Sequence, residues 1–212
     1  MKQTLFFLLL VAAPIVFAPA QDFEGVIAFA MKGPQESRNL EYFTKGEMVR
    51  MQFEQAPGMT MAVVVNSKTG AAFVLMTESK MYMEMNLQDM PAPEGSQNDI
   101  DFQKTGKTEN ILGYTCEQVL MKQQGMEVEM WVTKGLGRFV QSNFNAGSKS
   151  PAMKKIEDEL TSKGYFPLRM FSKSGGQSEF RMEALSVTRK QLRKDLFVLP
   201  AGFTKMQMPP RQ

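Results

Sequence analysis

The amino-acid sequence predicts a mainly β protein, made of antiparallel strands and one amphipathic helix. Three observations support this fold class. Apolar residues alternate with polar ones along most of the chain after Asp22, which is the period of a half-buried strand. The connections between the alternating runs are too short for crossover helices, so neighbouring strands should pair antiparallel. Only one stretch has the period of a helix.

The alternation predicts a series of strands separated by short turns. In the runs 48–53, 81–86 and 126–133, apolar side chains recur at every second position, so each run has one buried and one wetter face. Turns that contain glycine separate the runs and favour hairpins. The predicted strands span residues 23–32, 38–45, 47–54, 59–66, 71–77, 80–87, 101–109, 114–122, 126–133, 138–143, 166–173 and 178–189, with a short one near 196–199.

The helical stretch covers residues 151–163. Ser150 is a suitable N-cap, Pro151 suits the first helical position, and Gly164 suits the residue just past the end. We expect this helix to lie over the sheet as a lid. Its apolar stripe consists of Met153, Ile156 and Leu160.

The composition excludes much common enzyme chemistry. The 212 residues include no His and one Cys, which excludes a Ser-His-Asp or Cys-His nucleophilic site, a His-bearing zinc site and a Cys-rich metal cluster. The formal net charge is only +3, and no dense basic stripe with interleaved aromatic residues is present, so we expect no nucleic-acid partner. We therefore expect a binding protein rather than an enzyme, with no cofactor and no metal.

The first twenty residues have the features of a signal peptide. Lys2 is followed by an apolar run over residues 5–18, which is shorter than the roughly 20 residues that cross a bilayer. Ala18-Pro19-Ala20 then supplies the small-x-small pattern of a cleavage site. We expect residues 1–20 to be removed, residues 21–212 to form a single domain, and the protein to be exported to the periplasm or the extracellular space without a transmembrane segment.

Three motifs of the chain are distinctive: Gly113, Tyr114 and Cys116 in the run 107–117, Trp131 in the run 129–133, and Pro200, Gly202 and Phe203 in the run 196–203. They resemble motifs of a bacterial family of exported proteins, domain of unknown function 4412, which is similar to the LolA-like lipoprotein carriers. The resemblance spans roughly residues 23–208. It implies a strongly curved antiparallel sheet, an incomplete β-barrel, with helical cover over an apolar concave face that holds acyl chains in LolA-like carriers. The chain departs from LolA in having no helix before the first strand.

The chain has 19 Met, many of which follow the strand period. Methionine is unbranched and polarizable and adapts to variable apolar guests, so we expect these residues to line the concave face and to bind a hydrophobic small molecule or an acyl chain. An ordinary core filled with methionine is the other interpretation. The residues predicted to line the site are Met51, Phe53, Phe73, Met81, Met83, Met85, Met126 and Met130.

Two other functions fit the same sequence. In the first, the protein is a structural or regulatory module with a filled core, which meets another envelope protein through a sheet edge or through the basic run Arg189 to Lys194. In the second, the thioethers of Met81, Met83 and Met85 bind Cu(I), since soft sulfur ligands select this ion. For Cys116 we expect a buried, inert thiol, and the alternative is a reactive or intermolecularly paired thiol.

Overall fold

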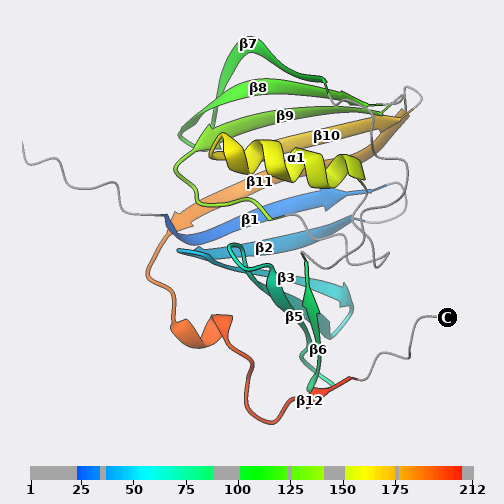
Figure 1. The fold of residues 1–212 in the computed structure, drawn as a ribbon, viewed down its shortest axis with the longest axis vertical. Coiled ribbons are helices and arrows are strands. Elements are labelled where there is room, and N and C mark those ends of the chain that lie inside the picture. Colours follow the sequence, from blue (N-terminus) through cyan, green and yellow to red (C-terminus); the bar gives the residue numbers. More distant parts are fainter. Residues whose placement is uncertain are drawn as a thin grey trace, which may run out of the picture.

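The computed structural model describes residues 23–33, 37–87, 101–123, 126–140, 151–174 and 177–206, so the predicted signal peptide lies outside the described residues. Twelve strands form one large, curved, open sheet (Figure 1). The strands are β1 (Glu24–Lys32), β2 (Ser37–Lys45), β3 (Met48–Ala56), β4 (Met59–Asn66), β5 (Ala71–Met76), β6 (Met81–Asn86), β7 (Asp101–Ile111), β8 (Tyr114–Gln123), β9 (Met126–Lys134), β10 (Tyr165–Ser174), β11 (Gln177–Arg189) and β12 (Thr204–Lys205).

The order of strands in the sheet is β12-β6-β5-β4-β3-β2-β1-β11-β10-β9-β8-β7. Every neighbouring pair is antiparallel except β12 and β6, which are parallel. The predicted fold class, mainly antiparallel β in an incomplete barrel, is therefore confirmed. β11 returns beside β1, which places the last long strand in the middle of the sheet.

The predicted helix is present as α1 (Pro151–Ser162), and it ends before Gly164, which has a positive φ of 64° as the chain turns into β10. Figure 1 shows α1 lying across the sheet, where it packs on β10. We call the face that α1 covers the inner face. The sheet curves around α1, because Asp158 and Thr161 of the helix share a small pocket with Val65 and Gly70, although four strands separate β4 from β10.

The inner face under α1 is a packed core. Phe29, Tyr42, Phe139 and Phe166 contact one another as stacked and edge-to-face rings, with centroids 5.4–6.4 Å apart. Ile156 and Leu160 of α1 are fully buried in the same cluster, as their spacing predicts, whereas the side chain of Met153 lies outside the described residues.

The predicted strand at 138–143 is wrong for residues 138–140, which form no strand, and the remainder lies outside the described residues. The buried hydroxyl of Tyr42 replaces a strand partner here. It donates a hydrogen bond to the Arg138 carbonyl (2.8 Å) and accepts one from the Val140 amide (2.9 Å). The alternating apolar residues Phe139 and Val140 are nevertheless buried, because this segment lies under the curved sheet.

Residues 190–206, which we call the C-terminal belt, run from the end of β11 to β12 (Figure 1). The belt packs on the opposite, outer face of the sheet. The predicted strand at 196–199 is wrong, because a 3-10 helix, η1 (Lys194–Phe197), occupies this place. Its main chain is held by side chains of the sheet instead of by a ladder. Arg50 donates to the Leu196 carbonyl, and Lys45 donates to the Leu192 carbonyl. The side chains of Leu192 and Phe197 are buried on the outer face, where they pack in one cluster with Val26 and Val64.

Candidate functional site

The methionines of the inner face form two rows across the sheet. In one row Met61, Met76 and Met81 are direct cross-strand neighbours on β4, β5 and β6. In the other row Met31 of β1 is followed by the methionines of β11, β10 and β9. Because strand period and register agree over so many strands, the predicted clustering of methionine on shared faces is confirmed. The second row consists of Met31, Met182, Met170 and Met130.

The predicted lining residues differ in burial. Met51 and Met130 are 2% and 0% exposed, so a ligand on the present surface would not touch them. The others on the inner face retain partial exposure, and most of them pack at the margin of the main core. The partly exposed members are Phe53, Met81, Met83, Met85 and Met126.

The prediction that Phe73 belongs to this lining is wrong. Phe73 pairs with Val64 and Glu84, and it packs in the outer cluster with Phe197 of the C-terminal belt. Its strand is apolar on both faces, because the belt covers the outer one. The alternation that distinguishes inner from outer positions in other strands is therefore missing from β5.

A cleft opens where β3 diverges from β2. The ladder between these strands runs from their hairpin to the pair Leu40 and Phe53, where it ends. Beyond this pair β2 continues to Ser37, still paired with β1, and β3 continues to Ala56, still paired with β4. Two strands that are adjacent in the sheet thus separate at one end, and the main chain of each borders the space between them.

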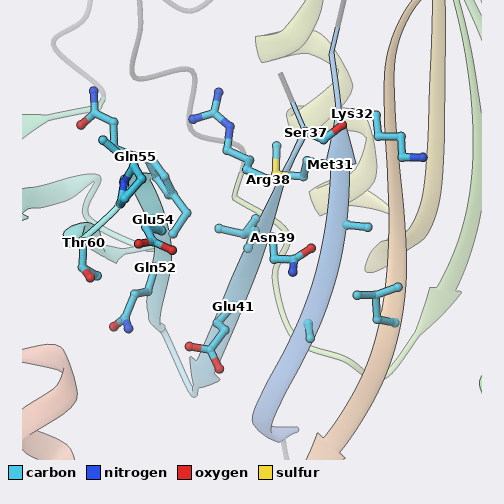
Figure 2. Close-up of a pocket in the computed structure, with 17 residues that line it drawn as sticks. Met31, Lys32, Ser37, Arg38, Asn39, Glu41, Gln52, Glu54, Gln55 and Thr60 are labelled. Atoms are coloured by element: carbon cyan, nitrogen blue, oxygen red, sulfur yellow. The ribbon is translucent and has the colours of Figure 1, made fainter. Parts of the chain in front are cut away.

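This cleft has a volume of about 940 Å³ and is open to solvent. Ala28 and Ala30 of β1 form the floor of the cleft, and their small side chains leave the space above them open. Leu185, which is 54% exposed, adds an apolar surface from a bulge in β11. Figure 2 shows polar side chains reaching it from both separated strands. They include Asn39 and Glu41 of β2, Gln52, Glu54 and Gln55 of β3, and Thr60 of β4.

The guanidinium of Arg50 connects the cleft to the C-terminal belt. Arg50 donates to the Gln52 side chain in the cleft wall and also to the Leu196 carbonyl of the belt. Burial lowers the pKa of this guanidinium, and the nearby Glu41 carboxylate offsets part of the effect. Glu54 accepts a hydrogen bond from the Gly58 amide, which fixes its position at the cleft. The sequence contained no signal for the cleft, since a ladder end depends on pairing geometry.

The motif residues in the middle of the chain form a hairpin turn and part of the buried core. Leu112 and Gly113 both have positive φ, 53° and 86°, in the tight hairpin between β7 and β8, and the Asn110 side chain accepts a hydrogen bond from the Gly113 amide. Tyr114 packs against the core from the first position of β8. Cys116 is a free, buried thiol, and burial raises its pKa to about 11, which favours the predicted inert state.

Trp131 lies half-buried on β9, opposite Gln118 and Arg169, and its indole donates to Glu129. In the C-terminal belt, Pro200, Gly202 and Phe203 connect η1 to β12, with Gly202 at a positive φ of 80°. The charged residues of the basic run are exposed, whereas Leu192 within it is buried. The motifs therefore shape hairpins, strand faces and the belt.

An outer-face ion network was not apparent from the sequence. Arg169 donates to both oxygens of Glu109 (3.0 and 2.8 Å) and to Glu183 (3.2 Å), so it joins β7, β10 and β11. Within the described ranges no three His, Cys, Asp or Glu residues gather as a metal site. No helix in this part of the chain is long and apolar enough to span a membrane.

Residues 23–203 match the model of the family described as Domain of unknown function (DUF4412). The chain belongs to this family. The match covers strands β1 to β11, α1 and most of the C-terminal belt, and it confirms the resemblance of the sequence motifs. No curated protein matches the chain in sequence.

Solved structures of the same fold share little sequence with this chain. An uncharacterized conserved protein from Thermus thermophilus is 11% identical, with a TM-score of 0.53 over 88% of this chain and 93% of that one. PNGF-II is 15% identical with a TM-score of 0.53, over 89% of this chain but 31% of its own. The Pseudomonas aeruginosa MucA/MucB complex contains a chain that is 12% identical, with a TM-score of 0.51 over 90% of this chain and 63% of that chain.

At such low sequence identities, the structural likeness shows the fold alone. This chain spans about a third of PNGF-II and less than two thirds of the chain matched in the MucA/MucB complex. The likeness agrees with the LolA-like architecture expected from the sequence, in which a curved antiparallel sheet wraps around helical cover.

Proposed function

We propose that this protein is an exported, non-catalytic binding module that holds an extended segment of a partner protein in the cleft between β2 and β3. The observation that carries the proposal is the end of the ladder at Leu40 and Phe53, while both strands continue. Strand edges bordering a cavity are templates for an added strand, because main-chain groups supply the hydrogen bonds.

The side chains of the cleft suit an extended polypeptide. Asn39, Gln52 and Gln55 bear amides that both donate and accept hydrogen bonds, as a peptide main chain requires. Ala28 and Ala30 leave room for the segment's side chains, and Leu185 gives one apolar contact. In an extended segment, alternate side chains would meet this floor while the others face solvent.

The packed inner core favours a protein partner over a large enclosed ligand. The aromatic cluster around Tyr42 fills the space beneath α1, and Ile156 and Leu160 seal it. The solved MucA/MucB complex supports the same direction, because a chain of this fold there has a protein partner. The signal-like residues 1–20 support export, and the lack of histidine supports a non-catalytic role.

Partial exposure of inner-face methionines favours a second candidate function, the binding of a fatty acyl chain. Met83 and Met85 lie beside the main core with their side chains partly accessible, and methionine adapts to apolar guests. Such a ligand would occupy the inner face, whereas the polypeptide segment would occupy the cleft. The two candidates therefore respond to different substitutions.

A peptide-display selection against the purified mature chain tests the main proposal. Selected peptides are measured for affinity to the wild type, to Ala30→Phe, which fills the cleft floor, and to Ala71→Phe, which adds the same ring to an exposed position of β5. We expect Ala30→Phe to weaken peptide binding roughly tenfold or more, since it removes space the segment needs, and Ala71→Phe to leave it unchanged. A fluorescent fatty acid is titrated in parallel.

Each outcome separates the candidates. Peptide binding that survives Ala30→Phe, or a failure to select any peptide, would rule out the cleft as the site of a polypeptide segment. Saturable binding of the fatty acid that is indifferent to Ala30→Phe would favour the inner-face candidate instead. Thermal unfolding of both variants verifies that the two rings leave the fold intact.

A further inference from the structure

We propose that Met61, Met76 and Met81 form a binding site for a soft monovalent cation, Cu(I). This inference is independent of the cleft. The three residues lie on adjacent strands β4, β5 and β6, and the register pairs Met61 with Met76 and Met76 with Met81. They are therefore three successive members of one cross-strand row.

Cross-strand neighbours lie closer together than neighbours along one strand. Directly opposite residues have Cβ atoms about 4.5–5.5 Å apart. Residues i and i+2 of one strand, such as Met81 and Met83, are separated by about 6.8 Å, because each residue adds about 3.4 Å. The row consequently brings three methionine Cβ atoms closer than the series Met81, Met83 and Met85, which the sequence spacing singled out for copper.

All three side chains point to the inner face and remain accessible. Met61 shares this face with Val63, and Met76 shares it with Val74, both of which belong to the main core. The row itself is partly exposed, in contrast to the buried Met51 and Met130. A cation can therefore reach part of each of these residues without opening the core.

The chemistry of the row selects a soft ion. Thioether sulfur is a neutral, polarizable ligand that suits Cu(I), whereas harder divalent ions prefer nitrogen and carboxylate oxygen. Each methionine has an unbranched side chain that is flexible enough to turn its sulfur toward the central Met76. Three neutral sulfurs offset none of the charge of a bound ion. The cost of desolvating the ion is therefore larger for a divalent ion than for a monovalent one, which disfavours divalent ions at this site.

A competition titration tests the site. Purified mature protein is titrated with Cu(I) against the chromophoric chelator bicinchoninate under anaerobic, reducing conditions. The test variant is Met61→Leu/Met76→Leu/Met81→Leu, and the matched control is Met31→Leu/Met126→Leu/Met206→Leu, which replaces three partly exposed methionines that do not share a row. Methionine and leucine have similar volumes, so both variants should fold, and thermal unfolding verifies this.

We expect one Cu(I) per wild-type chain, a loss of affinity of roughly tenfold or more in the row variant, and little change in the control. X-ray absorption of the wild-type complex should show sulfur as the only ligand type. Equal affinity in wild type and row variant, an equal loss in both triple variants, or nitrogen and oxygen ligation would overturn the site. If the row variant unfolds, the single Met76→Leu variant takes its place, with the same expected direction.

Discussion

Tyr42 is the residue on which the inner core depends most directly. It is fully buried, contacts Phe29, Phe139 and Phe166, and its hydroxyl satisfies two main-chain groups of the segment 138–140. Burial raises the pKa of this hydroxyl, and the hydrogen bond from the Val140 amide opposes the effect, so the residue stays neutral at physiological pH. The hydroxyl thus holds an irregular segment against the sheet.

Tyr42→Phe should lower the free energy of unfolding by about 1–3 kcal/mol, because it removes the hydrogen-bond partner of the Arg138 carbonyl and of the buried Val140 amide while keeping the ring. Urea denaturation measures the change. The control is Tyr114→Phe, which removes the hydroxyl of a half-buried tyrosine at the first position of β8. Equal stability of the two variants would show that the Tyr42 hydroxyl does not anchor the segment.

Single residues also mark what the sequence could and could not reveal. The alternation of Met81, Met83 and Met85 placed these side chains on one face, and the register agrees with it, because Met83 and Met85 pair with the core residues Val74 and Ala72. The prediction for Phe73 was wrong because β5 is apolar on both faces, so the period of two did not indicate which face of this strand is the inner one. The outer cover that explains it lies more than a hundred residues further along the chain.

At the level of elements, the C-terminal belt depends on Glu24. Its carboxylate accepts hydrogen bonds from the Leu192 amide and from Lys45, which also donates to the Leu192 carbonyl. The hydrogen bond from Leu192 lowers the pKa of Glu24 below its ordinary value, and Lys45 adds to the effect. A carboxylate with a depressed pKa stabilises the docked belt above its unfolded-state pKa and loses this contribution as pH falls through the folded-state pKa.

Hydrogen exchange at the Leu192 amide should therefore show decreasing protection as pH falls below about 4. In Glu24→Gln, which cannot become charged, protection should be lower at neutral pH and should no longer depend on pH in that range. The control Glu47→Gln changes an exposed carboxylate paired with Lys68 and should behave like the wild type. A Glu24→Gln profile indistinguishable from the wild type would contradict this role for Glu24.

The pairing of elements sets a limit on prediction from sequence. Strand positions and the helix followed from local periodicity, whereas the segment 138–140 and η1 did not, because side chains from distant strands determine their conformation. The ladder end between β2 and β3 has no local signature either. Both strands alternate as usual up to the point where they separate, so the cleft depends on the curvature of the sheet.

At the scale of the whole molecule, the two candidate sites occupy different parts of one sheet. The inner face combines a sealed aromatic core with one partly exposed methionine row, that of Met61, Met76 and Met81, and the outer face carries the C-terminal belt. The cleft is bordered by side chains of both faces, including Met31 and Phe53 of the inner one. Arg50 connects the belt to the cleft wall through Leu196 and Gln52. This link means that the belt helps to hold one wall of the proposed binding site in place.

The most direct test of the central claim is hydrogen exchange of the mature chain, free and bound to a selected peptide. A segment added at the separated strands should protect the main chain of residues 37–39 and 54–56, beyond the last β2–β3 pair, and this protection should disappear in Ala30→Phe. Protection confined to α1 and strands β8–β10, or binding with no protection at residues 37–39 and 54–56, would contradict the assignment of the cleft.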